Sequence, residues 1–160
     1  EPVLWRHRTV TRMGADAHMD GGDVLMVDKR FFVGLTSRTD EAGVREFAAV
    51  VEPFGYRVDA IAVSDGLHLK SIVNYVGRNT LILNEEGARN PAFAGFTHLV
   101  LDKQEEYAGN TLWLNDTLIT PSGYPDTLAK LQTVGLPILQ LDTSEIRKMD
   151  GGLTCLSLRF

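Results

Sequence analysis

Short apolar runs typical of strands alternate along this chain with longer stretches whose apolar residues recur at helical spacing. In residues 39–51, apolar side chains from Val44 to Val51 lie three or four positions apart, which predicts a helix with one buried face. The helix should end before Pro53, because proline lacks a backbone donor and clashes with the preceding turn. Two strand patterns precede this helix and one follows it. The pattern thus predicts a unit of two strands, a helix and a strand.

The same order recurs twice more. The second strands begin at Phe31, Thr80 and Thr117, a period of roughly forty residues that is typical of repeat architectures. We therefore predict an α/β fold of repeated ββαβ units in one domain, residues 1–160. The predicted units cover residues 20–64, 65–102 and 108–142. The expected strands are 23–27, 30–35, 57–63, 69–76, 80–83, 97–101, 111–114, 117–120 and 137–141. The expected helices are 39–51 and 125–132, with a short helix or turn at 90–95.

The end of the chain departs from this repeat. A short helix is predicted at residues 144–149, with Ser144 as its cap. Residues 153–160 alternate like a strand and have no following helix, so this strand is expected to close onto another unit. The chain also begins at Glu1 rather than at a methionine, which suggests a piece of a longer chain.

Composition limits the classes of partner. The chain has 44% hydrophobic and 23% charged residues, as soluble domains do, and a net charge of -5. Nucleic acids and anionic membrane surfaces both attract clustered Lys and Arg, so neither is an expected partner. No apolar run approaches the roughly 20 residues of a membrane-spanning helix. One cysteine cannot form an internal disulfide, which favours a reducing, cytoplasmic location.

That cysteine, Cys155, is the first candidate for chemistry. It follows the Gly151–Gly152 turn, and such a junction could expose the thiol and stabilise its thiolate. A lone cysteine in an apolar strand is also a common small core residue. Both interpretations stay open from the pattern alone. No phosphate-binding glycine loop and no serine nucleophile motif occur in the sequence, and no cofactor is expected.

A histidine and a carboxylate cluster complete the candidates. His68 follows a predicted strand on a turn, where functional side chains are frequent. Residues 16–23 contain Asp16, His18, Asp20 and Asp23, which could orient a catalytic histidine, bind a hard metal ion or form a polar turn. The histidines lack zinc-ligand spacing, so no metal is expected. A thiol, a histidine and a carboxylate are the components of a cysteine hydrolase, although spacing does not show that they converge.

Four segments, in the same order along the chain, resemble the dimethylarginine dimethylaminohydrolases of the guanidino-modifying superfamily. They are MDGGDVL (19–25), FFVGLTSRT (31–39), DGLHLKS (65–71) and MDGGLTCLS (149–157). The resemblance implies the five-bladed, propeller-like pentein fold, of which about three of the five units are present here as its C-terminal part. The N-terminal blades are then missing partners, and they would carry acidic groups that hold a guanidinium. A homodimer is a further expectation.

The resemblance also assigns roles to the candidates. Cys155 would attack the guanidinium carbon of an Nω-methylated L-arginine and form a covalent thiouronium intermediate. His68 would protonate the departing methylamine or dimethylamine and then activate water, and Asp20 would orient His68. The product would be L-citrulline. A thiolate and a protonated imidazole must coexist for this chemistry, because a guanidinium is a poor electrophile.

Further positions would bind the substrate. Arg38 would clamp its carboxylate through the planar guanidinium fork, and the backbone of Met149 and Asp150 would line its amino-acid end. Lys70 replaces the aspartate that arginine deiminases and amidinotransferases carry two residues after the histidine, which favours a methylated substrate. Three alternatives remain: an arginine deiminase-like or other guanidino or ureido hydrolase, a non-catalytic pentein binding module, and a metal-binding domain at residues 16–23.

Overall fold

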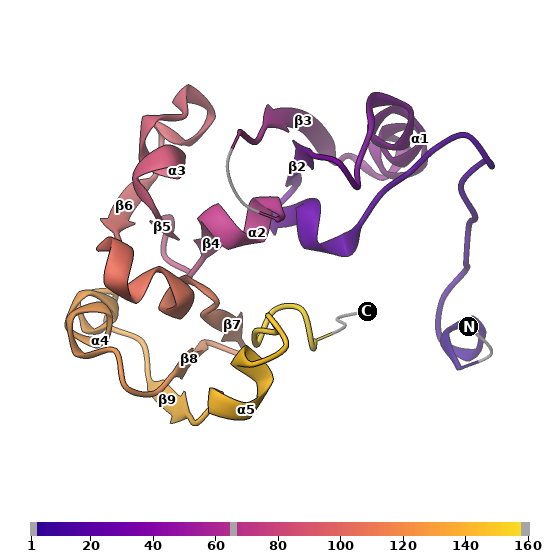
Figure 1. Cartoon of the computed structure of the whole chain (residues 1–160). Coiled ribbons are helices and arrows are strands. Elements are labelled where there is room, and N and C mark those ends of the chain that lie inside the picture. The colour runs from indigo at the N-terminus through magenta and orange to yellow at the C-terminus, as the bar shows by residue number, and fades with distance from the viewer. Residues whose placement is uncertain (1–2, 65–66, 158–160) are drawn as a thin grey trace.

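The computed structural model describes residues 3–64 and 67–157, and within them three three-stranded sheets follow one another along the chain. In each sheet the first two strands are antiparallel and the third runs parallel to the second. The units curve around an open centre (Figure 1), and the crossover helices of residues 41–51 and 125–132 lie on the outer side of the ring. The predicted α/β fold of repeated ββαβ units is confirmed.

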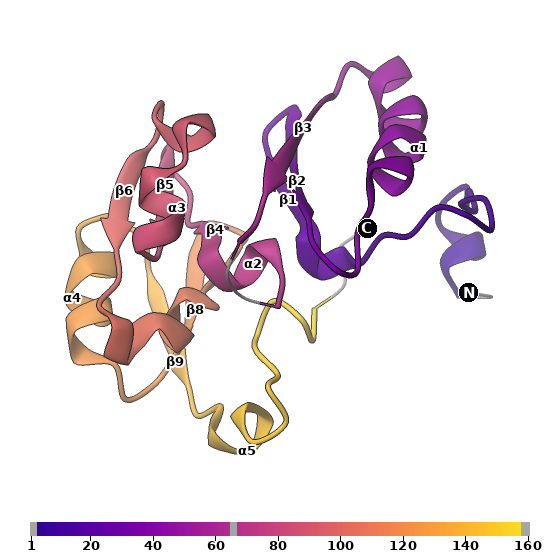
Figure 2. The same ribbon diagram turned by 45° about the horizontal axis from the view of Figure 1, so that its top comes forward.

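The first unit shows how local sequence produces this arrangement. Strands β1 (Val24–Val27) and β2 (Arg30–Leu35) form a hairpin, and β3 (Arg57–Ala62) pairs with β2 after the crossover helix α1 (Glu41–Val51). A parallel pair needs such a crossover, because a tight turn cannot join parallel strands. The helix begins at Asp40, whose side chain accepts a hydrogen bond from the Gly43 amide at 2.7 Å. Figure 2 shows α1 covering the outside of this sheet.

The other units repeat the plan with shorter helices. Each contains a strand hairpin, a crossover and a third, parallel strand. The second unit comprises α2 (Leu69–Ile72), β4 (Val73–Tyr75), β5 (Thr80–Leu83), α3 (Glu85–Arg89) and β6 (Thr97–Val100). The third comprises β7 (Leu112–Leu114), β8 (Thr117–Pro121), α4 (Pro125–Gln132) and β9 (Ile138–Leu141), followed by α5 (Ser144–Arg147). Short 3-10 helices are Leu4–Arg6, Gly21–Asp23 (η2), Glu52–Phe54, Pro91–Phe93 and Lys103–Gly109 (η5).

The buried core lies between neighbouring units rather than inside each one. Phe32 of the first unit is fully buried and meets Phe93 of the second edge to face, with ring centroids 5.2 Å apart. A second cluster joins Ile82 of the second unit to Leu118 and Leu131 of the third. A unit of this size cannot bury its apolar face alone, so each is stabilised by the next one along the chain.

One predicted element in the second unit was wrong in detail. Residues 69–76 were expected to form one strand, but Leu69–Ile72 is a helical turn and only Val73–Tyr75 is a strand. Leu69 and Ile72, three positions apart, are both buried, so a helical turn satisfies this apolar pattern as well as a strand does. The short helix or turn expected at 90–95 is present as the 3-10 helix Pro91–Phe93. The pattern did not predict α3, which precedes it and is capped by the Asn84 side chain accepting from the Gly87 amide at 3.0 Å.

The closing strand predicted at residues 153–160 is also wrong where the structure describes it, since residues 153–156 form turns. The Leu156 amide donates to the Gly152 carbonyl at 3.2 Å, and the Thr154 hydroxyl donates to Asn110 Oδ1 at 2.8 Å. Local bonds thus replace the ladder that a strand requires. Residues 158–160 lie outside the described residues.

Helix α5 ends at Arg147, short of the predicted 149, and Thr143 rather than Ser144 precedes its first turn. In the described part of the chain, no helix is both long and apolar enough to cross a membrane.

Candidate functional site

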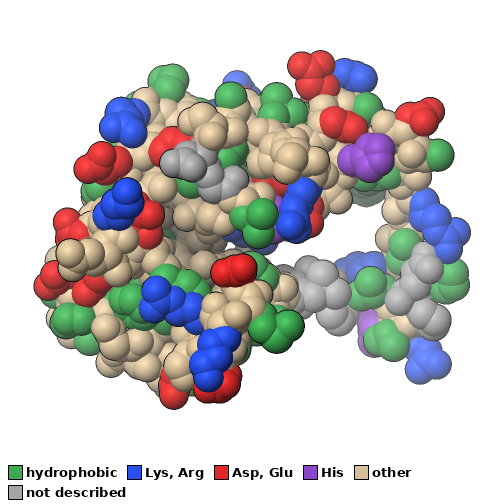
Figure 3. Space-filling view, viewed as in Figure 1, with side chains coloured by type: hydrophobic (Ala, Val, Ile, Leu, Met, Phe, Trp, Pro, Cys, Tyr) green, Lys and Arg blue, Asp and Glu red, His purple; other side chains and the backbone are tan. Residues whose placement is uncertain are grey.

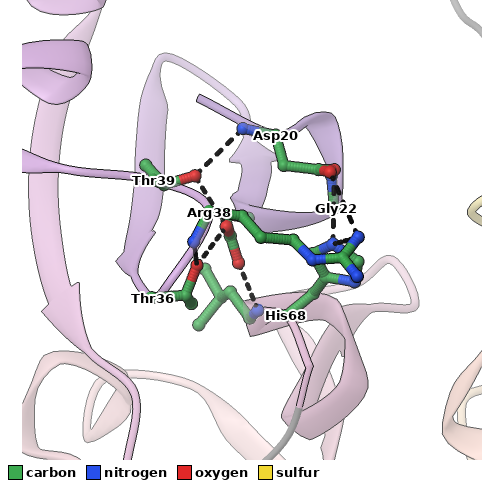
Figure 4. A network of polar contacts seen from close by, with 8 residues as sticks. Asp20, Gly22, Thr36, Arg38, Thr39 and His68 are labelled. Carbon is green, nitrogen blue, oxygen red and sulfur yellow. Dashed lines mark hydrogen bonds and ion pairs between the residues drawn. The ribbon is translucent and has the colours of Figure 1, made fainter. Parts of the chain in front are cut away.

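The candidate site lies at one edge of the first sheet. Because β1 is antiparallel to β2 and β3 is parallel to it, the start of β1 and the ends of β2 and β3 meet at the same edge. The chain places η2 before β1, the loop of residues 36–39 after β2, and His68 beyond β3. Three segments distant in sequence therefore converge there, as Figure 4 shows for the side chains that they carry.

His68 is held at this edge with its side chain largely buried. It precedes the first turn of α2, its side chain is only 12% exposed, and its Nε2 lies 3.4 Å from Asp20 Oδ1. A Cβ atom on Gly22 would lie 2.6 Å from the imidazole ring, a distance that real Cβ contacts do not show. The absence of a side chain at position 22 therefore allows the ring to approach Asp20.

Asp20 is fixed at both its backbone and its side chain. Its amide donates to the Thr39 hydroxyl at 3.0 Å, and its Oδ1 accepts from the Gly22 amide at 2.8 Å. The hydrogen bond from the Gly22 amide is the largest cause that lowers the pKa of Asp20, and the nearby His68 and Arg38 lower it further against the opposing effect of burial. Asp20 is therefore held as a carboxylate beside the His68 ring.

Asp20→Asn should give a pH-dependent loss of stability. Because the folded-state pKa lies below the ordinary value of 3.8, the charged carboxylate stabilises the fold above that value and loses this contribution as the pH falls through the lowered pKa. Urea unfolding should thus show a deficit for the variant at neutral pH that shrinks as the pH falls below 3.8. Asp16→Asn, which removes the same charge at an exposed position, is the control. A deficit that is independent of pH would contradict this account.

Arg38 lies beside the Asp20–His68 pair with its side chain half exposed. Its Nη1 is 3.7 Å from Asp20 Oδ2 and 3.5 Å from His68 Nε2. The Arg38 amide donates to the Thr36 hydroxyl at 3.1 Å, which orders the loop that carries it. The site thus combines a carboxylate, an imidazole and a guanidinium, and the guanidinium retains open surface with which to bind an anionic group.

The sequence analysis did not predict the role of Asp23. This residue is fully buried and accepts hydrogen bonds from the hydroxyls of Thr36 and Thr39, at 2.7 and 2.6 Å, and from the Leu69 amide at 2.9 Å. One signal was available: Asp23 leads directly into an apolar strand, where a carboxylate must find donors. The donors themselves lie 13 to 46 positions away and could not be identified from spacing.

Cys155 comes from the opposite end of the chain. It is exposed and lies in the turn that follows α5, not in the core. Figures 1 and 2 both show this C-terminal segment running from α5 back toward the first unit. Within residues 3–64 and 67–157, no hydrogen bond joins Cys155 to His68 or Asp20. The structure therefore brings Asp20, His68 and Arg38 together and leaves the thiol outside their hydrogen-bond network.

Met149 and Asp150 lie on the same C-terminal segment. Met149 is 87% exposed and Asp150 has a positive φ of 55°, so the backbone turns sharply before Gly151. Tyr107 of η5 anchors this turn by donating its hydroxyl to the Gly151 carbonyl at 2.9 Å.

The space-filling view shows an opening in the middle of the ring, with acidic, basic and histidine side chains at its rim (Figure 3).

The Asp16–Asp23 segment does not form one cluster in space. Asp23 points into the protein, whereas His18 is exposed and its Nδ1 lies 3.0 Å from Asp40 Oδ2. Among residues 3–64 and 67–157, no three His, Cys, Asp or Glu side chains are arranged to hold a metal ion. Asp65 and Gly66, which belong to one of the four segments quoted above, lie outside the described residues.

Comparison with known proteins identifies the relatives of this arrangement. No family model matches the chain. Over 151 residues, or 94% of the chain, it is 36% identical to the dimethylarginine dimethylaminohydrolase of Pseudomonas aeruginosa, and over 141 residues it is 35% identical to that of Streptomyces coelicolor. A solved structure of the Pseudomonas protein superposes with a TM-score of 0.90 over 93% of the chain. In sequence and fold, the chain is therefore similar to the dimethylarginine dimethylaminohydrolases.

Its likeness to these dimethylarginine dimethylaminohydrolases covers only part of their length. The chain spans 59% of the Pseudomonas relative and 54% of the Streptomyces one. A cyanobacterial arginine dihydrolase shares the fold, with a TM-score of 0.86 at 18% identity. These neighbours place the three units in the pentein fold that the resemblance implied.

Proposed function

We propose that this chain carries the catalytic residues of a hydrolase that converts Nω-methylated L-arginine to L-citrulline and methylamine or dimethylamine. The observation that supports this most is the largely buried His68 beside Asp20, in a chain related over nearly its whole length to dimethylarginine dimethylaminohydrolases. A carboxylate next to an imidazole favours the protonated imidazole, which is the form that can give a proton to a leaving amine.

The proposed reaction has two steps. The Cys155 thiolate forms a bond to the guanidinium carbon, the bond from that carbon to the methylated nitrogen breaks, and His68 gives its proton to the departing amine. Neutral His68 then takes a proton from water, which attacks the same carbon and releases Cys155 and citrulline. Asp20 keeps the ring oriented through both steps, and the exposed position of Cys155 makes its sulfur accessible to substrate.

Two solved structures of relatives support this pairing of Cys155 and His68. One is a citrulline complex in which a cysteine is replaced by serine, and another is an adduct with S-methyl-L-thiocitrulline in which a histidine is replaced by glycine. In the numbering of those structures, the two substituted residues are separated by as many positions as His68 and Cys155 are here. We infer that both pairs perform the same chemistry.

The remaining groups bind the amino-acid end of the substrate in this proposal. Arg38 clamps the substrate carboxylate with its exposed guanidinium face. The backbone of Met149 and Asp150, on the sharp turn next to the nucleophile, lines the same end. Lys70, two positions after His68, carries no carboxylate for an unsubstituted guanidinium, and we propose that it favours a methylated substrate.

We further propose that the three units are the C-terminal blades of a five-bladed ring. The absent blades would supply acidic groups that hold the guanidinium, so the 160-residue chain alone should turn over little substrate. The cytoplasmic location and the homodimer expected from the sequence stay predictions.

The test is a product assay on a longer protein that contains this chain as the C-terminal blades of a five-bladed ring. Nω,Nω-dimethylarginine, Nω-methylarginine and arginine are incubated separately, and citrulline and the released amine are quantified. Citrulline with dimethylamine or methylamine, and far less citrulline from arginine, is expected. Faster release of ammonia from arginine would favour the deiminase-like alternative. No turnover of any of the three would leave a non-catalytic module as the better account.

A further inference from the structure

Asp23 links the backbones of the proposed site residues through one buried carboxylate. The Asp20 amide donates to the Thr39 hydroxyl, which in turn donates to Asp23 Oδ2. The Arg38 amide donates to the Thr36 hydroxyl, which donates to the same oxygen. Two chains of hydrogen bonds thus run from Asp20 and Arg38 and end at the same atom (Figure 4).

A third connection reaches the histidine. Asp23 Oδ1 accepts from the Leu69 amide at 2.9 Å, and that amide belongs to the peptide joining His68 to Leu69. Leu69 is fully buried, and a Cβ atom added to Gly34 would lie 2.8 Å from the Cβ atom of Leu69. The His68–Leu69 peptide is therefore held by a hydrogen bond to Asp23 and by close packing of Leu69 against Gly34.

The direction of these bonds requires an acceptor at Oδ2. Each threonine hydroxyl accepts from one backbone amide and gives its single proton to Asp23. An amide nitrogen at this position would offer protons to oxygens that already accept one and would leave both hydroxyl protons without their acceptor. Hydrogen bonds arranged head to tail also strengthen one another, so loss of the terminal acceptor weakens both chains.

We propose that Asp23 is a positioning residue that sets the spacing of Asp20, His68 and Arg38 and so determines both turnover and substrate binding. The inference rests on the function proposed above and extends it to a residue that does not touch the substrate. It acts through two separable connections: Thr39 to Asp20, which orients the catalytic histidine, and Thr36 to Arg38, which orients the substrate clamp.

The two connections are tested separately by Thr39→Val and Thr36→Val in a protein with the complete ring. Removing the Thr39 hydroxyl should lower kcat about tenfold, the effect of one hydrogen bond in a buried network, and leave KM within about twofold. Removing the Thr36 hydroxyl should raise KM by about the same factor and leave kcat nearly unchanged. Steady-state kinetics with dimethylarginine provide the measurement. Asp23→Asn should show both changes together.

Matched variants distinguish positioning from loss of stability. Thr39→Ser and Thr36→Ser keep the hydroxyl and should recover most of the wild-type values. Thr127→Val removes a buried hydroxyl that donates to the carboxylate of Glu105 at 2.7 Å, in the third unit. It should lower the melting temperature much as the site variants do and leave kcat and KM unchanged. Equal changes of both constants in Thr36→Val and Thr39→Val, or no rescue by serine, would overturn the proposal.

A readout without turnover separates this inference from the proposed function. The 15N signals of the His68 ring report its environment beside Asp20, and they should shift in Thr39→Val but not in Thr127→Val. If the wild-type protein has no activity and the signals still shift, the proposed function fails and the positioning role stands. If the wild-type protein is active, and Thr39→Val and Thr36→Val leave the kinetic constants and the His68 signals unchanged, Asp23 has no positioning role.

Discussion

Cys155→Ser should reduce citrulline formation from dimethylarginine by about a thousandfold or more in a protein with the complete ring. A serine hydroxyl stays protonated near neutral pH, whereas a thiol readily supplies a thiolate, and the guanidinium carbon is too poor an electrophile for a neutral hydroxyl. Cys155 is exposed, so the replacement should leave the unfolding free energy almost unchanged. Citrulline quantified under initial-rate conditions is the measurement.

Ser157→Ala is the control for this prediction. Ser157 lies two positions further along the C-terminal segment and donates its hydroxyl to the Thr154 carbonyl at 3.1 Å. Its removal perturbs the same segment without touching the thiol, and activity should fall by no more than a few fold. Turnover by Cys155→Ser at a rate near that of Ser157→Ala would remove Cys155 from the mechanism.

The second large effect is expected from Gly22→Ala. The added methyl group would lie 2.6 Å from the His68 ring, so the ring or η2 must move away and the 3.4 Å approach of His68 to Asp20 must lengthen. A displacement of about 1 Å can cost roughly a hundredfold in rate, because a general acid acts only within hydrogen-bond reach. We therefore expect kcat to fall by about this factor, measured with saturating dimethylarginine.

Gly21→Ala is a close control, since it adds the same methyl group one residue earlier. A Cβ at position 21 meets no atom within 4 Å, and neither glycine has a positive φ. Both variants therefore change backbone freedom alike, and only Gly22→Ala crowds the histidine. Equal activity of the two variants would show that the contact between position 22 and His68 has no influence on catalysis.

Much of the fold could be predicted because the repeat imposes the same pattern three times. The apolar spacing from Val44 to Val51 predicted a helix at residues 39–51, and Glu41–Val51 forms it with Asp40 as its cap. The pattern failed where the elements are short. Leu69 and Ile72 suit either a strand or a helical turn, and the hydrogen bond from the Leu69 amide to Asp23, 46 residues away, is compatible with the turn.

The site was less predictable, because its residues come from segments far apart in sequence. Asp20 and His68 were identified as candidates, but only the pairing of β1 and β3 with β2 brings them to one edge. The position of Cys155 was left open between core and exposed, and it is exposed. Asp23 was considered only as part of an acidic cluster, since its role depends on hydroxyls that the folded loops bring to it.

The central claim, that Cys155 attacks and His68 subsequently activates water, is tested most directly by treating His68→Gly with S-methyl-L-thiocitrulline. The leaving thiolate needs no proton from His68, so the sulfur of Cys155 should bond to the ligand carbon as methanethiolate departs. Without the imidazole, water should then hydrolyse the adduct only slowly. Peptide mapping by mass spectrometry should find a lasting adduct on the peptide that contains Cys155. An adduct at another residue, or one that disappears as fast as in the protein with His68, would contradict the account.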